Sequence, residues 1–95
     1  MNPVAVLGKV EMVDTTALFD VESSNIDAVG YDSKRMLLFV RFKYKPLVVW
    51  CYSGVPYEIY LAMQDSKSIG KYFHVHIDKK YEHEKIEYKE EEVKR

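Results

Sequence analysis

A short polar segment, SKSIGKYFHVH at residues 66–76, holds residue types suited to binding an anion. Ser68 and Gly70 stand where a run with helical spacing begins, and Lys67 and Lys71 add positive charge. The first turn of a helix exposes unpaired N–H groups and a partial positive charge, which can bind phosphate or carboxylate. The segment therefore indicates either an anion site or a helix start that the serine merely caps. Both interpretations stay open.

Aromatic side chains that can stack on a planar base accompany this segment. Tyr72 and His74 lie within it, and further tyrosines are spread along the chain at positions 31, 44, 52, 57 and 60. Stacking contributes ~1–3 kcal/mol per base in known sites. For most of these tyrosines the alternative is ordinary packing with the hydroxyl at the surface.

A second polar segment, Ser23-Ser24-Asn25, precedes an expected strand. Its side chains either bond a ribose or base edge, or bond their own backbone at a strand-entry turn. We take the following residues as the candidate ligand-binding set: Ser24, Asn25, Tyr31, Ser68, Gly70, Lys71, Tyr72 and His74.

Signals for catalysis and metal binding are weak. No nucleophile stands at a spacing from a base that predicts an enzyme, and Asp32 with His74 is the one pair left open. His74 and His76 lie two apart, so on a helix they point about 200° apart and cannot share a metal ion. The single cysteine, Cys51, excludes an internal disulfide and a cysteine zinc cluster. We expect no catalytic residue, no cofactor and no metal.

Alternating apolar residues predict an antiparallel sheet. MLLFVRF at 36–42 is the clearest strand, LVVWCYS at 47–53 follows it after a short turn, and IDAVGYD at 26–32 precedes it. Short turns can join only antiparallel neighbours, so the three strands form a meander. We expect Ile26, Ala28 and Gly30 to share one face, with Gly30 marking a bulge or a close approach of another backbone.

Two helices should follow the strands. Pro56 favours a helix start, and a break at QDSKS separates a second helix over about 69–81, whose apolar residues recur every four positions. The expected fold is α+β: an antiparallel β-meander of three to five strands covered on one face by two α-helices.

The N-terminal and C-terminal segments lie outside this expected arrangement of strands and helices. Residues 1–22 form an N-terminal extension that supplies a strand or an oligomer contact, and the charged residues 82–95 predict a solvated tail, with a helix or an added strand as alternatives. The chain has no secretion signal and no run of about 18 apolar residues, so we expect a cytoplasmic protein without a membrane span. A net charge of −1 argues against bulk attraction to nucleic acid.

The ordered set of motifs over residues 23–81 resembles the KTSC domain. The resemblance rests on Ser23, Ser24, Ile26, Gly30, Tyr31, Asp32, Val55, Pro56, Tyr57, Ser68, Gly70, Tyr72, Phe73, Ile77 and Tyr81. KTSC domains occur at the C-terminus of some lysyl-tRNA synthetases and as small free-standing proteins in bacteria and phages. The resemblance implies a sheet-plus-helices fold, a bacterial or phage-infected host and, by analogy, RNA or nucleotide recognition. This sequence departs from the family at the KYKP turn, the longer QDSKSIG segment and His74.

We therefore expect a non-catalytic protein that binds a nucleotide-type small ligand, in its sharpest form a phage or mobile-element sponge for a host-defence nucleotide signal. A homo-oligomer would help a chain of this size to enclose such a ligand. One alternative is an RNA-binding accessory domain, which needs a basic stripe made of Lys34, Arg35, Arg41, Lys43, Lys45, Lys67 and Lys71. A second alternative is a protein-interaction module that uses an exposed strand edge.

Overall fold

A computed structural model describes residues 6–7, 10–13 and 16–87 of the chain. The elements are β1 (Val6–Leu7), β2 (Val10–Val13), β3 (Thr16–Asp20), β4 (Ile26–Asp32), β5 (Leu37–Phe42), β6 (Val48–Ser53), α1 (Tyr57–Asp65), α2 (Ile69–His76) and β7 (His83–Glu87). Side chains are described at Val13 and at residues 16–87.

The strands form one seven-stranded sheet in chain order, and each strand runs antiparallel to the next. The predicted α+β class, the meander and the two helices are therefore confirmed. The sheet extends beyond the expected three to five strands because the N-terminal segment and part of the C-terminal segment both add to it. The strand interpretation of the N-terminal extension thus holds for its described residues.

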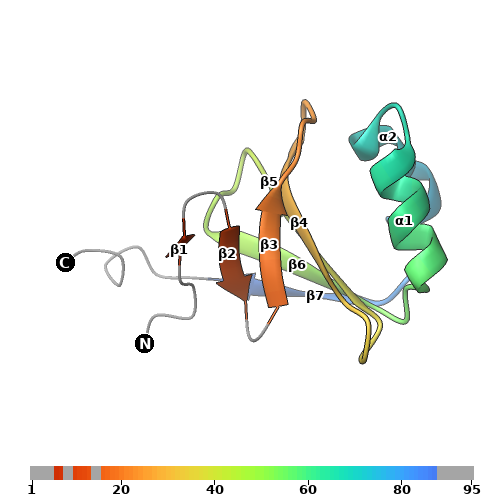
Figure 1. The fold of residues 1–95 in the computed structure, drawn as a ribbon, viewed down its shortest axis with the longest axis horizontal. Helices are drawn as coiled ribbons and strands as arrows, with labels where there is room; N and C mark the ends of the chain where they lie inside the picture. The colour runs from red at the N-terminus through yellow and green to blue at the C-terminus, as the bar shows by residue number, and fades with distance from the viewer. Residues whose placement is uncertain (1–5, 8–9, 14–15, 88–95) are drawn as a thin grey trace.

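The two helices lie together on one side of the sheet, next to β4–β6 (Figure 1). Buried residues form two clusters. The larger lies beneath the helices and joins Leu38 and Val40 of β5 to Met63 of α1 and Phe73 of α2. The smaller lies on the opposite face and includes Phe39. Because both faces of β5 are buried, this strand is central to the core, as the sequence predicted.

Strand β4 contains a bulge that changes which face of the sheet its first side chains lie on. The register shifts between Ile26 and Ala28, so that Asp27 is an extra residue opposite β5. The extra residue reverses the alternation, and Ile26 therefore packs beneath the helices while Ala28 packs in the opposite cluster. The expectation that these two side chains share a face was wrong for this reason.

Gly30 fulfils the expected close approach. A Cβ atom at this position would collide with the backbone carbonyl oxygen of Ala17 on β3. Only a residue without a side chain lets β3 and β4 approach so closely here.

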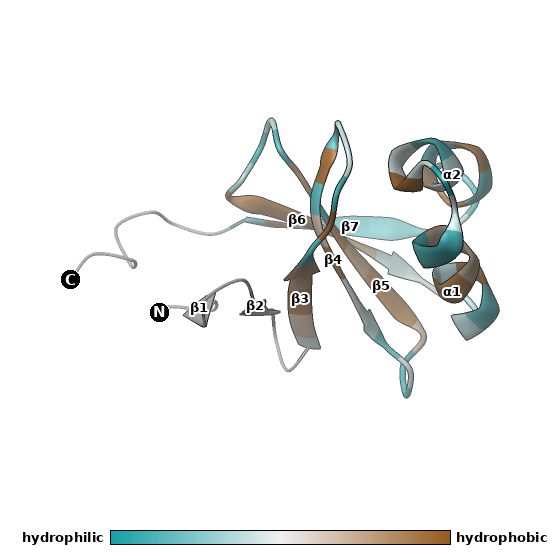
Figure 2. Cartoon of the chain, turned by 45° about the horizontal axis from the view of Figure 1, so that its top comes forward, coloured by the Kyte–Doolittle hydropathy of each residue, from teal (hydrophilic) through white to brown (hydrophobic). Residues whose placement is uncertain are grey.

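Two predictions on the C-terminal half need correction. Helix α2 ends at His76 rather than near residue 81, with Ile77 as its C-cap. Residues 83–87 are not a solvated tail but an edge strand, in which Ile86 lies opposite Val49 of β6. Its neighbours are charged and exposed, which is usual for an edge strand, and β7 stands out as hydrophilic in Figure 2. Residues 88–95 of the predicted tail lie outside the described residues.

No helix in the described part of the chain is long and apolar enough to cross a membrane.

Candidate functional site

The start of α2 is built by a serine cap. Ser68 is the N-cap residue, and its Oγ accepts a hydrogen bond of 3.3 Å from the Lys71 backbone N–H. The Ser68 carbonyl accepts the Tyr72 N–H at 3.0 Å. Capping, one of the two interpretations of this segment, is therefore present, while anion binding stays a prediction.

A concave surface of about 420 Å³, which we call the helix-start pocket, lies beside this cap. Its lining consists of Ser66, Lys67, Ser68, Lys71, Tyr72, Val75 and His76. Three residues chosen from the sequence thus share one pocket. The Tyr72 and His76 rings lie 4.2 Å apart, centroid to centroid, with a tilt of 34°. The pocket combines two ammonium groups, hydroxyl groups and an aromatic pair within one small surface.

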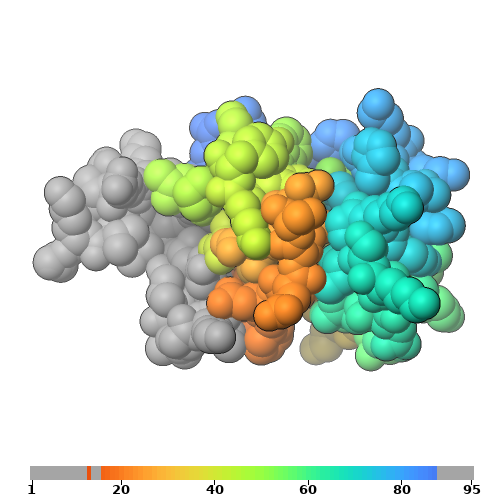
Figure 3. Space-filling model, turned by 90° about the horizontal axis from the view of Figure 1, so that it is seen from above, coloured from red at the N-terminus to blue at the C-terminus, as the bar shows by residue number. Residues whose placement is uncertain are grey.

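Gly70 faces away from this pocket, toward the other polar segment. A Cβ atom at position 70 would stand 3.2 Å from Ser23 Oγ and 3.8 Å from Asn25 Nδ2. The space-filling view shows residues near 20–25, in orange, directly beside the cyan helical segment (Figure 3). The fold therefore packs the two polar segments against each other, but Gly70 supports packing and does not line the pocket.

The Ser23–Asn25 segment forms a strand-entry turn. Ser23 Oγ accepts the backbone N–H groups of Asn25 and Ile26, at 3.3 and 3.2 Å. Ser24 Oγ donates to Asn25 Oδ1 at 3.5 Å. These local bonds correspond to the turn that was the alternative to a ligand site. Ser24 and Asn25 are exposed and lie outside the lining of the helix-start pocket.

His74 also lies outside the helix-start pocket. Its Nδ1 lies 3.3 Å from Asp78 Oδ2, one turn further along, and most of its side chain is exposed. Asp32, the partner left open for it, instead pairs with Arg35. Within the described ranges, no group of three or more His, Cys, Asp or Glu side chains converges as metal ligands would.

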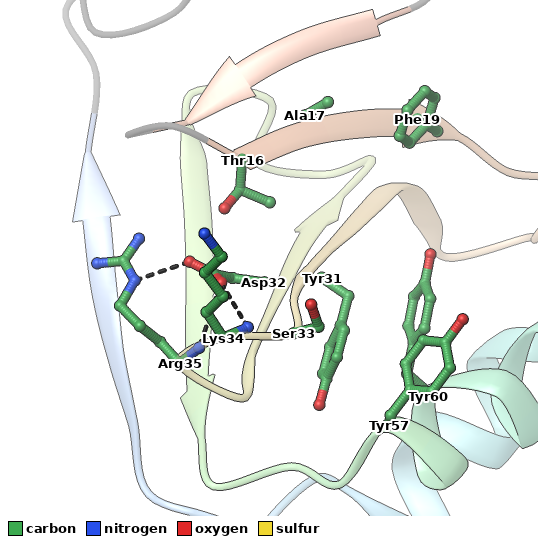
Figure 4. Close-up of a pocket in the computed structure, with 10 residues that line it drawn as sticks. All are labelled: Thr16, Ala17, Phe19, Tyr31, Asp32, Ser33, Lys34, Arg35, Tyr57 and Tyr60. Carbon is green, nitrogen blue, oxygen red and sulfur yellow. Dashed lines mark hydrogen bonds and ion pairs between the residues drawn. The ribbon is translucent and has the colours of Figure 1, made fainter.

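Tyr31 belongs to a different concave surface, which we call the tyrosine groove. This open groove has a volume of about 640 Å³. It lies between β3, the β4–β5 turn and α1, as Figure 4 shows. Its lining consists of Thr16, Ala17, Phe19, Tyr31, Asp32, Ser33, Lys34, Arg35, Tyr57 and Tyr60. The sequence could place Tyr57 and Tyr60 three apart on one helix face, but not opposite Tyr31, because that contact spans the sheet and helix layers.

Three tyrosine rings pack together at one end of the groove. Tyr31 and Tyr60 are stacked, with centroids 4.9 Å apart and planes at 12°, and Tyr57 is tilted against both. The Tyr31 hydroxyl donates to the Val55 carbonyl. Burial, followed by the negative charges of Glu58 and Asp32, raises the pKa of Tyr31. Tyr31 therefore stays a neutral hydrogen-bond donor across the physiological range.

Charged residues of the β4–β5 turn form the other end. Asp32 Oδ1 accepts the backbone N–H groups of Lys34 and Arg35, and Oδ2 accepts Arg35 Nε at 2.7 Å. The side-chain hydrogen bond from Arg35 is the main reason that the pKa of Asp32 is lowered. These hydrogen bonds from the backbone to the Asp32 side chain stabilise the turn at residues 32–35.

The basic stripe of the RNA interpretation is interrupted. Arg41 is 6% exposed, and its guanidinium lies 2.8 Å from the carboxylate of Asp27 at the bulge. Including Arg41 in an exposed stripe was therefore wrong, because its side chain is buried and forms an ion pair with Asp27. The remaining stripe residues are exposed but lie on separate turns and helices.

Comparison with known proteins gives one consistent result. The pattern that defines the KTSC domain matches residues 22–81. The fold is similar to the crystal structure of a KTSC domain protein from Yersinia pestis, with a TM-score of 0.68 and 29% sequence identity over 73% of this chain and 94% of that chain. No curated protein matches the sequence.

Proposed function

This chain belongs to the KTSC domain family, and we propose that it is a non-catalytic protein that binds a nucleotide-type small ligand in the helix-start pocket. In this proposal the phosphate lies between Lys67, Ser68 and Lys71, and the base lies against Tyr72 and His76. One observation carries the proposal: the residues suited to phosphate and those suited to a base line the same pocket.

Each part of the pocket has a physical role in the proposal. Two lysines and the positive end of α2 favour a dianionic group, and the serine hydroxyl of the cap can donate its proton to a phosphate oxygen. The Tyr72–His76 pair offers an aromatic face on which any base can stack. A volume of about 420 Å³ lies in the range of small-molecule pockets.

The pocket is an open surface, which limits how tightly one copy of the chain can hold a ligand. Enclosure by a second copy would remove water from the phosphate contacts and strengthen them. We therefore extend the proposal to a homo-oligomer that sequesters its nucleotide without turnover, as a phage or mobile-element sponge would.

The direct test is isothermal titration with adenosine, guanosine, cytidine and uridine 5′-monophosphates, beside native mass spectrometry of the protein purified from bacterial cells. We expect saturable binding of at least one nucleotide, with an affinity about tenfold weaker in Lys71→Glu because an attractive charge becomes repulsive. Lys80→Glu makes the same charge change at an exposed position outside the pocket and should bind as the unmodified protein does.

Two results would count against the proposal. One is the absence of binding by all four nucleotides at millimolar concentration together with a ligand-free native mass. The other is normal binding by a folded Lys71→Glu variant. An RNA gel shift that weakens steeply with added salt would instead favour the RNA-binding alternative. If the protein binds neither nucleotides nor RNA, the protein-interaction alternative is favoured.

A further inference from the structure

The tyrosine groove has features of a ligand site that the proposed function does not use. Hydrogen bonds hold both rings of the Tyr31–Tyr60 stack at its tyrosine end. The Tyr31 hydroxyl donates to the Val55 carbonyl, and Gln64 Nε2 donates to the Tyr60 hydroxyl at 3.4 Å. Tyr57 packs on this stack but is 51% exposed. No described residue forms a hydrogen bond with its hydroxyl. A fixed aromatic base with one open ring is the arrangement of a stacking platform.

Phe19 of β3 adds a second exposed ring to the groove. Its side chain is 50% exposed, and it lies across the groove from the β4–β5 turn (Figure 4). Phe19 and Tyr57 are thus two large, half-exposed aromatic side chains on one concave surface. The platform therefore presents ring surface to whatever enters the groove.

The charges of the groove leave one cation available. Asp32 is occupied by Arg35 and by two backbone N–H groups, so its negative charge is compensated within the turn. Lys34 has no carboxylate within ion-pair distance among the described residues, and its side chain rises from the turn toward Thr16 (Figure 4). Glu58 is the opposing charge near Tyr31, but it does not line the groove.

From this arrangement we propose that the tyrosine groove is a second ligand site, which binds a planar aromatic ring carrying one anionic group. The ring lies on Tyr57 and the anion pairs with Lys34. The groove volume of about 640 Å³ admits a ligand of this size. The anion is a phosphate or a carboxylate, since an ammonium group attracts either. The site is separate from the helix-start pocket and stands independently of the function proposed there.

The test is an amide NMR titration with four probes. Adenosine 5′-monophosphate and indole-3-acetate each combine a ring with an anion, adenosine supplies a ring alone, and inorganic phosphate supplies an anion alone. We expect one or both of the first two to shift the amides of Lys34, Tyr57 and Tyr60. Adenosine binding as tightly as its phosphate would overturn the role of Lys34, and phosphate alone causing the same shifts would overturn the role of the ring. If none of the four probes shifts these amides, the proposed site is wrong.

Variants separate the platform from the charge. Tyr57→Ala should weaken binding about tenfold, as the loss of one stacking contact does, and Lys34→Glu should weaken it by a similar factor. The matched controls are Tyr44→Ala and Lys45→Glu, which make the same changes in the exposed β5–β6 turn and should leave binding unchanged. Folded Tyr57→Ala and Lys34→Glu variants that bind normally would overturn the proposal. The amides of residues 67–76 report on the helix-start pocket, and those of Lys34, Tyr57 and Tyr60 report on the tyrosine groove. The same titration therefore shows whether binding fails at one site or at the other.

Discussion

Gly70 at the start of α2 lies directly against Ser23 at the entry to β4, so close that a Cβ atom at position 70 would stand 3.2 Å from Ser23 Oγ. This distance is tighter than ordinary packing, and Ser23 Oγ is held in place by two backbone N–H groups. The contact fixes α2 relative to the sheet and thereby positions the helix-start pocket. Glycine at position 70 therefore has a packing role, and it lies outside the lining of the helix-start pocket.

The first prediction concerns this contact. Gly70→Val should lower the free energy of unfolding by about 1–3 kcal/mol, because its branched side chain forces the helix away from the turn. Urea denaturation followed by circular dichroism measures the change. Leu61→Val, at an exposed interior position of α1, controls for the effect of a β-branched residue in a helix. Equal stability of Gly70→Val and the unmodified protein would show that the contact is loose.

The second prediction concerns the bulge. Asp27→Ala should destabilise the protein by about 1–3 kcal/mol, because it removes the carboxylate that lies 2.8 Å from the buried Arg41 guanidinium. Asp27 is itself 36% exposed, so the cost should fall toward the lower end of this range. Chemical denaturation of Asp27→Ala beside Asp20→Ala, an exposed aspartate on β3, tests the difference. Similar midpoints for the two variants would contradict it.

The third prediction concerns the titration of Asp32. Its pKa in the folded protein should lie below the ordinary value of 3.8, chiefly because of the Arg35 hydrogen bond. A lowered pKa means that the contribution of Asp32 to stability is present above pH 3.8 and is lost as the pH falls through the folded value. An NMR titration of the carboxyl carbon measures the pKa directly. In Arg35→Gln the midpoint should rise toward 3.8, and an unchanged midpoint would exclude Arg35 as the cause.

The fourth prediction concerns alkaline pH. Burial is the main reason that the pKa of Tyr52 is raised above its ordinary value of 10.0, with Asp78 as a smaller cause. The folded state therefore holds this proton more tightly, so stability should be intact below pH 10 and should fall as the pH rises further. Tyr52→Phe should reduce this loss. Identical alkaline unfolding of Tyr52→Phe and the unmodified protein would refute the prediction.

Local sequence patterns determined the order and type of the central elements. Alternation in residues 36–42 and 47–53, with short turns between strands, leaves an antiparallel meander as the only connection, and Pro56 and Ser68 mark the two helix starts. Glycine at position 30 signalled a close backbone approach that the structure contains. These features depend on neighbours in sequence, and the sequence alone was therefore sufficient.

The tertiary structure alone decided how distant residues meet. The bulge at Asp27 sets which face each β4 side chain takes, and β7 gains its structure only from pairing with β6. The predicted site divided for the same reason: Ser68, Lys71 and Tyr72 share one pocket, while Tyr31 joins another. Register and layer packing depend on contacts between segments far apart in the chain. The spacing of apolar residues within one segment therefore does not predict them.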